Sequence, residues 1–573
     1  MLTPDSPARP SGTLRCAVGT AGLAVVVAIA FLLDLGRPYL WEPNEGRYAE
    51  IVREMLLTRN WITPTLNFAP YYDKPPGFFW LVAAAFQLLG TSEWAARLPA
   101  AISAVLTIAA TVAFGWRRIG PMAALGAGAV LATAIEFVAL GRSVRMDTVL
   151  TLTVSGTLFY AYALWDAPNP THEAGVKHRA TWPLYVLSAL GLLVKGPVAV
   201  ALPVLVLAAL TLVTGEYRRL RRFRPGLGAL IAVALASTWY VSTAISAPDY
   251  LWVFLWRQNL GRFLGAGRGT GHTEPLWFFF WILPVTFLPW TLFFPGTFRR
   301  GFERIRGGDR VTLFLLVWFA VVFVFFTLSR AKLAPYMLPA FPPLALLVSA
   351  YVAEALQAPE PERMRAFKIP GLVWAVGMLA GTIGVVLGVA VRYPSYGLRA
   401  AVALVLAIVP LAGWVALRQH RWRTVPALVL VGALAIQALF YRVGAPVVNE
   451  FASFRTAAEV ARALPPAAPI FAYKTRGHSF SFYDGRTVKG VLSSEAAAAA
   501  LQGPLPAGLL TKTKHLGSIQ RHLAEPVCIW WQSASGRVLL ANLPAPQTAS
   551  HGALLPLAPA ANAEAAAASP PDC

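Results

Sequence analysis

The chain has 573 residues, of which 57% are hydrophobic and only 13% are charged, and its mean hydropathy is +0.56. Soluble domains carry about 25% charged residues, so this composition excludes a string of soluble domains and indicates an integral membrane protein. The net charge of +22 would suggest nucleic-acid binding in a soluble chain, but membrane topology alone demands an excess of Arg on one side, and we expect no nucleic-acid partner.

Apolar stretches of about 20 residues, bounded by charges or turn residues, predict membrane-spanning helices. Thirteen such segments follow a short polar N-terminus, residues 1–16, which leads into what we interpret as an uncleaved anchor. The segments are 17–36, 97–116, 121–140, 148–165, 181–194, 197–214, 226–246, 276–295, 311–328, 334–355, 370–391, 399–417 and 424–443.

The distribution of positive charge orients these segments. When residues 1–16 are placed in the cytoplasm and the segments alternate, every dense cluster of Arg and Lys falls on the cytoplasmic side, as the positive-inside rule requires. The largest clusters span residues 218–224 and 299–310. The odd number of segments then puts everything after about residue 444 on the periplasmic face.

The first outer loop, residues 37–96, contains two further helical patterns. Between Glu45 and Leu57, apolar side chains recur on one face, while Glu50, Arg53 and Glu54 lie mostly on the opposite face, which we expect to be solvated. Residues 77–90 are apolar but short, and counting them as a span would invert every later loop. We interpret them as a helix that lies in the outer membrane interface.

The composition changes after residue 444. The segments APIFAY, HSFSFY and CIWW are typical of short strands, whereas EAAAAALQ and residues 450–463 are typical of helices. They predict a small periplasmic α/β domain over residues 446–543. From residue 544 to 573 Ala and Pro dominate, which predicts a disordered tail. Cys16, Cys528 and Cys573 are far apart and form neither a disulfide framework nor a zinc spacing.

Ionisable residues gather at the outer ends of the predicted spans, where unpaired charge is costly and therefore informative. Pro75 and Pro76 hold the segment before them extended and so present Asp73 and Lys74 in a loop. Asp147 follows Arg145 at a span end, and both a structural ion pair and a catalytic role remain open for it. The set consists of Glu42, Glu45, Arg47, Asp73, Lys74, Arg142, Arg145, Asp147, Lys195, Arg257, Arg262, Arg268, His272, Arg330, Lys332 and Tyr336.

Single members of this set have simpler explanations, such as a lipid-headgroup anchor for Arg262 or an interfacial lysine for Lys74. Together they predict a basic, partly acidic pocket that faces the outer leaflet and suits a phosphate-bearing lipid. Lys and Arg can hold a phosphodiester and stabilise a departing phosphate, and a carboxylate can take the proton of an acceptor hydroxyl. No P-loop, HExxH or CxxC motif indicates another chemistry.

Several motifs resemble one known family. In chain order they are EPNEGRYAEIVREML, NWITPTLN, YYDKPPGFFW, EWAARLPAAISA, SVRMD, LLVKGPVAVALP, FLPW and SRAKLAPYMLPAFPPLAL. They resemble the bacterial aminoarabinose-lipid A transferases and the broader polyprenyl-phosphate-sugar glycosyltransferases of the GT-C class, kin to protein O-mannosyltransferases. The match covers residues 17–445, and HSFSFYDGRTV resembles the start of that family's periplasmic C-terminal domain.

The resemblance implies an α-helical GT-C membrane fold of about 13 spans in the bacterial inner membrane. It implies inverting transfer of an aminoarabinose-like or other pentose or hexose from an undecaprenyl-phosphate donor to lipid A or another envelope acceptor. Lys74 and Arg262 would hold the donor phosphate, with Arg47 and Lys195 beside it. The residues that would line the cavity are Asn44, Tyr48, Tyr71, Asp73, Arg145, Lys332 and Tyr336.

One departure affects the expected chemistry. The family usually has Asp-Glu where this chain has Asn44-Glu45, and Asn44 has no carboxylate to act as a base. Glu45, together with Asp147, is therefore the candidate catalytic pair. The sequence requires no cofactor; a divalent metal beside Asp73 is left open, because no His partner is evident. A protein O-mannosyltransferase-like enzyme, a flippase for lipid-linked sugars and an inactive acceptor-binding scaffold are the alternatives.

Overall fold

The computed structural model describes residues 12–167, 181–265, 273–392, 396–397, 401–544 and 556–557. The chain divides into two compact units. One, the helical unit, consists of Met1–Leu35, Tyr72–Phe78 and Arg97–Phe440. The other, the α/β unit, consists of Gly36–Tyr71, Phe79–Ala96 and Tyr441–Cys573.

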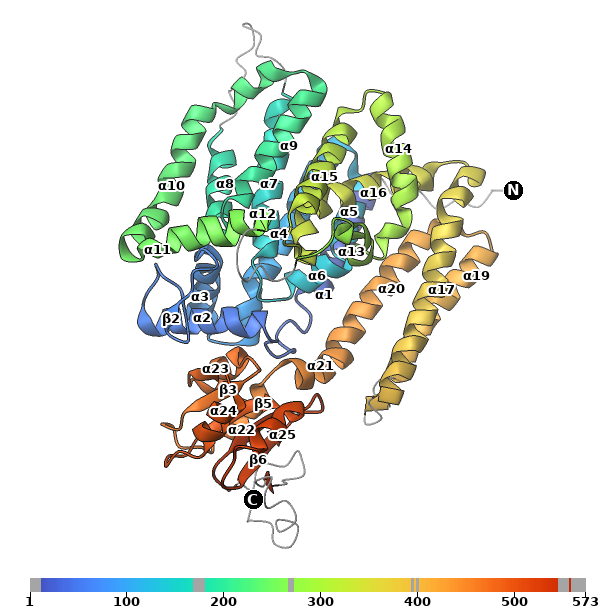
Figure 1. Ribbon diagram of the computed structural model, residues 1–573. Coiled ribbons are helices and arrows are strands. Elements are labelled where there is room, and N and C mark those ends of the chain that lie inside the picture. Colours follow the sequence, from blue (N-terminus) through green and yellow to red (C-terminus); the bar gives the residue numbers. More distant parts are fainter. Residues whose placement is uncertain are drawn as a thin grey trace, which may run out of the picture. The chain divides into compact units, whose positions relative to one another are not determined.

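Helices make up the described part of the helical unit (Figure 1). In chain order they are α1 (Gly12–Phe31), α4 (Glu93–Arg118), which enters this unit at Arg97, α5 (Pro121–Leu131), α6 (Ile135–Gly141), α7 (Asp147–Trp165), α8 (Trp182–Lys195), α9 (Val198–Thr214), η1 (Tyr217–Phe223), α10 (Pro225–Ser246), α11 (Pro248–Leu251), η2 (Trp252–Gly261), α12 (Arg262–Leu264), α13 (Phe278–Thr286), η3 (Trp290–Phe293), α14 (Phe294–Arg306), α15 (Arg310–Leu328), η4 (Ala334–Ala340), α16 (Phe341–Gln357), α17 (Glu360–Arg392), η6 (Val402–Ala407), α19 (Ile408–Arg418), η7 (Trp422–Thr424) and α20 (Val425–Leu439).

Each of the thirteen apolar segments coincides with a helix or a helix pair. Within the described residues, six helices are long and apolar enough to cross a membrane, and two bent pairs bring the number to eight. The segments 17–36, 181–194, 197–214, 226–246 and 399–417 correspond to shorter apolar helices. The chain is therefore a multi-pass helical membrane protein, whereas the number of thirteen crossings stays a prediction.

Two segments expected to be continuous helices are broken instead. The pair α5 and α6 bends by 65°, and the pair formed by α13 and the helices from Trp290 onward bends by 110°. The second break contains Pro289, which has no N–H to continue a helix. The breaks bond to each other: Ile135 N donates to Leu288 O (3.1 Å), and Trp290 Nε1 donates to Thr133 Oγ1 (2.8 Å).

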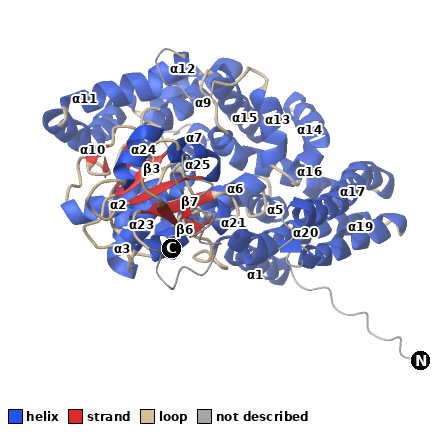
Figure 2. Cartoon of the chain, turned by 60° about the horizontal axis from the view of Figure 1, so that its bottom comes forward, coloured by secondary structure: helices blue, strands red, loops and turns tan. Residues whose placement is uncertain are grey.

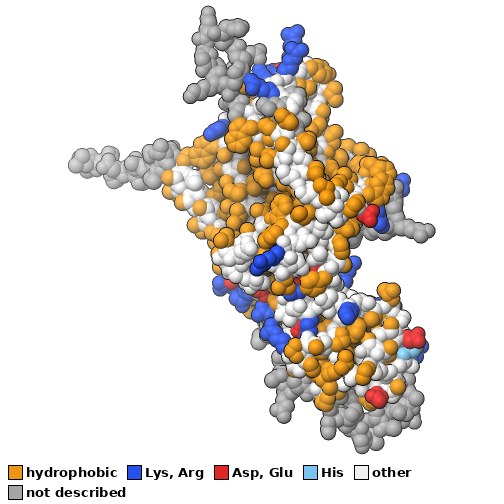
Figure 3. All heavy atoms as spheres, turned by 90° about the vertical axis from the view of Figure 1, so that its left-hand side faces the viewer, with side chains coloured by type: hydrophobic (Ala, Val, Ile, Leu, Met, Phe, Trp, Pro, Cys, Tyr) orange, Lys and Arg blue, Asp and Glu red, His pale blue; other side chains and the backbone are white. Residues whose placement is uncertain are grey.

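Aromatic packing and burial define the interior of the helical unit. The rings of Phe114 and Phe159 stack with centroids 4.6 Å apart, and those of Tyr162 and Phe314 with centroids 4.4 Å apart. The candidate span Ala334–Gln357 is 89% buried and Glu360–Val391 only 22%. Figure 3 shows hydrophobic side chains over much of the surface, as expected for helices that face lipid.

The α/β unit combines part of the first loop with the C-terminal region. Its first-loop elements are α2 (Asn44–Thr58), β1 (Thr65–Leu66), β2 (Ala69–Pro70) and α3 (Gly77–Leu89), which enters this unit at Phe79. The later elements are η8 (Phe440–Gly444), which enters this unit at Tyr441, α21 (Ala445–Ala452), α22 (Arg455–Ala461), β3 (Ile470–Tyr473), α23 (His478–Asp484), β4 (Val488–Val491), α24 (Ser494–Leu501), β5 (Gly508–Lys512), η9 (Thr513–His515), α25 (Leu516–Gln520), β6 (Val527–Gln532), β7 (Arg537–Ala541) and β8 (Pro556–Leu557).

Six of these strands form one mixed sheet in the order β4-β3-β5-β7-β6-β8 (Figure 2). Strand β3 is parallel to β4 and β5, while β7 is antiparallel to β5 and β6. Alternating residues fill a core on each face, with Leu510 and Leu539 in one cluster and Leu509 and Leu540 in the other. The strands at APIFAY and CIWW form as predicted. A separate periplasmic domain over residues 446–543 stays a prediction.

Other local expectations are wrong. The segment HSFSFY forms helix α23 rather than a strand, because a distant acceptor, Glu42 Oε1, takes the N–H of Ser479 in its first turn. The tail was expected to be disordered, yet Pro556–Leu557 pairs with β6; residues 545–555 and 558–573 lie outside the described residues. Cys528 is disulfide-bonded, a link that the cysteine spacing did not indicate.

Glu50 and Glu54 are buried, not solvated as their helical positions suggested. Glu50 forms an ion pair with Arg53 at 2.7 Å. Glu54 Oε2 accepts hydrogen bonds from Thr65 Oγ1 (2.6 Å) and Phe68 N (3.0 Å), so it anchors the β1–β2 hairpin. Helix α2 itself, with its apolar face buried, forms as predicted.

Candidate functional site

A cavity of about 370 Å³ lies within the helical unit. Three cationic residues, Lys74, Lys195 and Arg262, line it together with Tyr336. Most of its remaining wall is apolar, from Leu150, Pro197, Val198, Ala201, Leu255, Leu260, Phe263, Phe325, Phe326 and Ala331. The cavity therefore offers positive charge and hydrocarbon-compatible walls in one enclosure.

Lys74 is held by a rigid loop, as its two following prolines predicted. Its carbonyl accepts a hydrogen bond from Tyr250 Oη (2.7 Å). Asp73 Oδ1 accepts from Gln258 Nε2 (2.6 Å), which ties the loop to η2. Gly77 approaches α8 so closely that a Cβ there would lie 2.6 Å from Leu193 O. The position of the Lys74 backbone is thus set by three helices.

Asp147 lies between two cations. Its Oδ1 accepts from Lys195 Nζ at 2.6 Å, and its Oδ2 is 3.3 Å from Arg145 Nε. Asp147 begins α7 and Lys195 ends α8, so each charge also complements the dipole of its own helix. Lys195 Nζ lies 5.4 Å from the centre of the Tyr336 ring, within range of a cation–π interaction. The ion pair that the sequence left open is therefore formed.

Lys74 and Arg262 bring positive charge to the cavity wall. Within the described part of the chain, neither side chain makes an ion pair or a hydrogen bond. Burial, reinforced by the neighbouring Lys195 and Arg262, lowers the pKa of Lys74 to about 8, against the opposing effect of Asp73 and Asp147. Cations in such surroundings favour an anionic ligand, which would replace the missing counter-charge.

The predicted site residues of helix α2 meet one another, and Tyr71, in the α/β unit. Arg47 Nη2 donates to Asn44 Oδ1 (2.7 Å), and its guanidinium lies over the rings of Tyr48 (5.2 Å) and Tyr71 (5.9 Å). Glu45 is 5% exposed, and its Oε2 accepts from Trp41 N (3.1 Å). Helix α2 thus presents Asn44, Glu45 and Arg47 within a single turn.

Other residues that the sequence predicted for the site do not line the cavity or are not described. Lys332 donates to Glu274 O (3.0 Å) and is not among the residues that line the cavity. Arg268 and His272 lie outside the described residues. Within the described ranges, no three His, Cys, Asp or Glu side chains come together as metal ligands. The side chain of Asp73 accepts a hydrogen bond from the amide of Gln258.

The sequence interpretation missed Gln258 and Asn259, which also line the cavity. The signal was present, because Gln258 precedes Arg262 by four residues and so shares its helix face.

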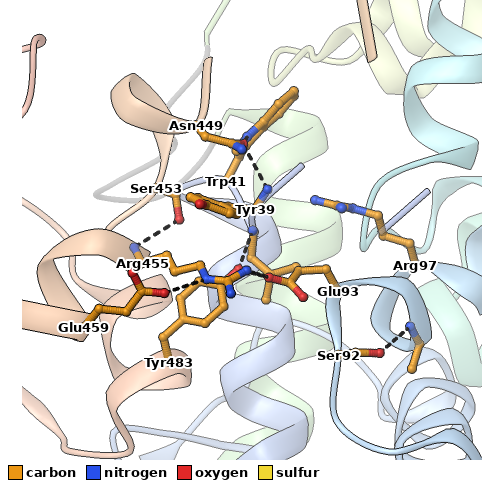
Figure 4. Close-up of polar contacts among 12 residues, drawn as sticks. Tyr39, Trp41, Ser92, Glu93, Arg97, Asn449, Ser453, Arg455, Glu459 and Tyr483 are labelled. Atoms are coloured by element: carbon orange, nitrogen blue, oxygen red, sulfur yellow. Dashed lines mark hydrogen bonds and ion pairs between the residues drawn. The ribbon is translucent and has the colours of Figure 1, made fainter. Parts of the chain in front are cut away.

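A polar cluster in the α/β unit was also missed (Figure 4). Arg455 forms ion pairs with Glu93 (2.7 Å) and Glu459 (3.0 Å), and its guanidinium lies 4.6 Å from the centre of the Tyr39 ring. Tyr483 Oη donates to the same Glu93 oxygen at 3.0 Å. The cluster connects α22, α23 and the first loop through one guanidinium that pairs with two carboxylates.

Comparison with known proteins identifies similar sequences. Residues 73–241 match the model of the dolichyl-phosphate-mannose-protein mannosyltransferase family. A protein of Pseudomonas savastanoi named undecaprenyl phosphate-alpha-4-amino-4-deoxy-L-arabinose arabinosyl transferase is 33% identical over 68% of this chain and 71% of its own. A Proteus mirabilis protein of the same name, numbered 1, is 32% identical over 58% of this chain, which spans 59% of that relative.

Solved structures show the same fold. ArnT from Cupriavidus metallidurans bound to undecaprenyl phosphate matches with a TM-score of 0.75 and 22% identity, over 95% of this chain and all of that one. The Archaeoglobus fulgidus oligosaccharyltransferase matches with a TM-score of 0.52 and 12% identity, over 94% of this chain and 75% of the other. These likenesses establish the helical membrane fold of the chain.

Proposed function

Because the chain belongs to the undecaprenyl phosphate-alpha-4-amino-4-deoxy-L-arabinose arabinosyl transferase family, we propose that it is a membrane glycosyltransferase that uses a polyprenyl-phosphate-linked sugar. The donor is an undecaprenyl phosphate carrying aminoarabinose or a related sugar. The acceptor is lipid A or another glycan of the bacterial envelope. A protein hydroxyl is the second acceptor class.

The observation that carries this proposal is the cavity with cationic side chains and apolar walls. A polyprenyl phosphate combines the complementary features, because its anionic phosphate is joined directly to a hydrocarbon chain. Lys74 and Arg262 would bind the phosphate oxygens, and Phe263, Phe325 and Phe326 would contact the first prenyl units. Lys195 would complete the phosphate site from its position on Asp147.

In the proposed reaction, an acceptor oxygen attacks the anomeric carbon of the sugar. The bond from that carbon to the phosphate oxygen breaks, and polyprenyl phosphate leaves with the electron pair. Lys74, Lys195 and Arg262 stabilise the charge that develops on the departing phosphate. A carboxylate takes the acceptor proton, and we assign this role to Glu45, since Asn44 has no titratable group. Displacement from the opposite face inverts the anomeric configuration.

Asp147 acts as a positioning residue in this scheme. A carboxylate held by two cations is a poor proton acceptor, but it fixes where those cations lie. Asp147 thereby keeps the ammonium of Lys195 directed toward the phosphate site. We also assign roles in transfer to Arg47, Tyr48 and Tyr71 of the α/β unit, and to Asp73 and Tyr336 of the helical unit.

The topology follows from the same proposal. Thirteen crossings, with the N-terminus in the cytoplasm, put the α/β unit and the reaction centre on the periplasmic side of the inner membrane. The distribution of Arg supports this orientation. The donor would then enter from the outer leaflet, where no nucleotide sugar is available.

A transfer assay with purified protein tests the proposal. Labelled undecaprenyl-phosphate aminoarabinose and lipid A are incubated with the protein in detergent, and labelled lipid A and released undecaprenyl phosphate are measured. We expect both products from the unaltered chain and neither from Lys74→Ala, while Lys368→Ala, an exposed lysine outside the cavity, retains activity. Full activity of Lys74→Ala would disprove the phosphate site. Movement of donor across vesicles without product would favour a flippase.

A further inference from the structure

A second, larger cavity lies in the helical unit, with a volume of about 840 Å³. It is formed by η3, α14, α16 and α17, and it lacks any residue of the Lys74 cavity. Its floor is apolar, with the buried residues Phe293, Ala355 and Ala366, whereas its rim carries three Arg and three Glu. This volume is in the range of sites that bind small molecules.

Most of the rim charge is compensated within the protein. Arg300 forms ion pairs with Glu303 (3.0 Å) and Glu354, and Arg304 reaches Glu354 at 2.8 Å. Arg299 pairs with Glu303 at 3.2 Å. These contacts connect α14 to α16 and give every charged side chain on this part of the rim a partner.

Two rim residues of α17 remain without such a partner. Among the residues that the structure describes, neither Glu362 nor Arg365 makes an ion pair or a hydrogen bond through its side chain. Their spacing of three would allow them to pair on the helix surface, yet both line the cavity separately. The cavity therefore offers one free carboxylate and one free guanidinium to the same ligand.

The surface next to this pair is suited to a hydrocarbon chain. Ile369 lines the cavity and is 69% exposed, and Val373 and Val376 continue its stripe along α17 at 50% and 55% exposure. Residues at these spacings share one face of a helix. In a membrane protein, such a stripe faces lipid, so a ligand headgroup in the cavity can remain attached to an acyl chain along α17.

We propose that this cavity binds an aminophospholipid, with Arg365 on its phosphodiester and Glu362 on its primary ammonium. The free charges match a headgroup that carries one phosphate and one amine. A phosphatidylglycerol headgroup could offer Glu362 only neutral hydroxyl donors, and a phosphatidylcholine headgroup could donate no hydrogen bond to it. Phosphatidylethanolamine meets both requirements. The site is separate from the Lys74 cavity and does not depend on the proposed transfer reaction.

Lipid binding to the delipidated full-length protein tests the proposal. The protein is mixed in detergent with equal amounts of phosphatidylethanolamine, phosphatidylglycerol and phosphatidylcholine, and native mass spectrometry measures the bound lipids. We expect phosphatidylethanolamine to exceed each of the others by about fivefold to tenfold, as one added charge-assisted hydrogen bond allows. Equal binding of the three lipids, or a preference for phosphatidylglycerol, would overturn the proposal.

Variants of Glu362 and Arg365 test which part of the headgroup each side chain contacts. Glu362→Gln should remove the preference for phosphatidylethanolamine while phosphatidylglycerol still binds, and Arg365→Gln should weaken both lipids. Glu360→Gln and Arg423→Gln make the same changes at exposed positions outside the cavity and should leave the preference intact. Thermal unfolding confirms that each variant is folded. A preference that survives Glu362→Gln would contradict the assigned ammonium contact.

Discussion

The ammonium of Lys195 lies 2.6 Å from Oδ1 of Asp147, where the last turn of α8 meets the first turn of α7. The Lys74 loop packs against the same end of α8 through Gly77 and Leu193. A charge pair at this junction links the orientation of two helices to the cavity.

The Asp147–Lys195 pair should behave as a unit. Asp147→Asn leaves Lys195 and Arg145 without their counter-charge, and we expect transfer to fall by about 100-fold, since removing one partner of a buried charge pair costs several kcal/mol. Lys195→Met should have an effect of similar size. The fold-loss of transfer activity in the double variant should be much smaller than the product of the fold-losses in the two single variants. Transfer rates of all four proteins give this double-mutant cycle, and fully multiplicative losses would contradict the coupling.

Transfer should depend on the charge of Lys74. Burial and the neighbouring cations lower its pKa to about 8, so in the free enzyme the ammonium is present below that pH and is lost as the pH rises through it. We therefore expect kcat/KM to decline above about pH 8. Bound phosphate stabilises the ammonium, so kcat should decline only at higher pH. The pH profile of Lys74→Arg should lack the decline, because the guanidinium keeps its proton.

Tyr336 should act through its ring rather than its hydroxyl. The ring centre is 5.4 Å from Lys195 Nζ, a distance at which a cation–π contact contributes about 0.5–2 kcal/mol. We expect Tyr336→Phe to retain most activity and Tyr336→Leu to lose about fivefold or more. Steady-state kinetics of the two variants decide the matter. Equal losses of activity in Tyr336→Phe and Tyr336→Leu would indicate that the hydroxyl is the important group.

The proton acceptor can be tested by moving the carboxylate by one residue. Glu45→Gln keeps an oxygen for the N–H of Trp41, so the protein should fold normally while transfer is lost. Asn44→Asp keeps the acceptor for Arg47 and supplies the carboxylate that this chain lacks. We expect the double variant to regain activity over Glu45→Gln. If the unaltered chain transferred no sugar and the Asn44→Asp variant did, the result would instead favour the acceptor-binding scaffold.

The positions of the helices were predictable because long apolar segments have few alternatives in a membrane protein. The extended loop of Lys74 was predictable from its two prolines, and Asp147 and Lys195 from their places at helix ends. Their meeting was not, because segment boundaries do not reveal which helices are neighbours. The breaks near Thr133 and Leu288 also depend on a contact between two distant segments.

Long-range contacts explain the wrong local predictions as well. The helical pattern of α2 correctly separated its apolar face, but it could not show that the β1–β2 hairpin covers Glu54. Burial raises the pKa of Glu50 to about 7, even though Arg53 opposes this effect. The alternation in HSFSFY favoured a strand. The segment is a helix instead, because Glu42 Oε1 accepts the N–H of Ser479 in its first turn. In each case a contact remote in sequence overrode the local pattern.

The last prediction concerns the packing of α2 on α23. A Cβ at Gly46 would lie 2.6 Å from Ser479 N and 2.8 Å from its Cα, and backbone atoms cannot rotate away as a side chain can. Gly46→Ala should therefore separate the two helices and destabilise the α/β unit by about 1–3 kcal/mol. Because α2 also carries Glu45 and Arg47, transfer should decrease with stability.

Gly377→Ala is the matched control, since its new Cβ would meet nothing within 4 Å in helix α17. There the substitution should be neutral or slightly stabilising, because alanine loses less backbone entropy in a helix than glycine does. Thermal unfolding in detergent, followed by tryptophan fluorescence, compares the two variants with the unaltered chain. Equal stability of Gly46→Ala and Gly377→Ala would mean that α2 and α23 do not pack closely at Gly46, and the positions of Glu45 and Arg47 would then not depend on α23.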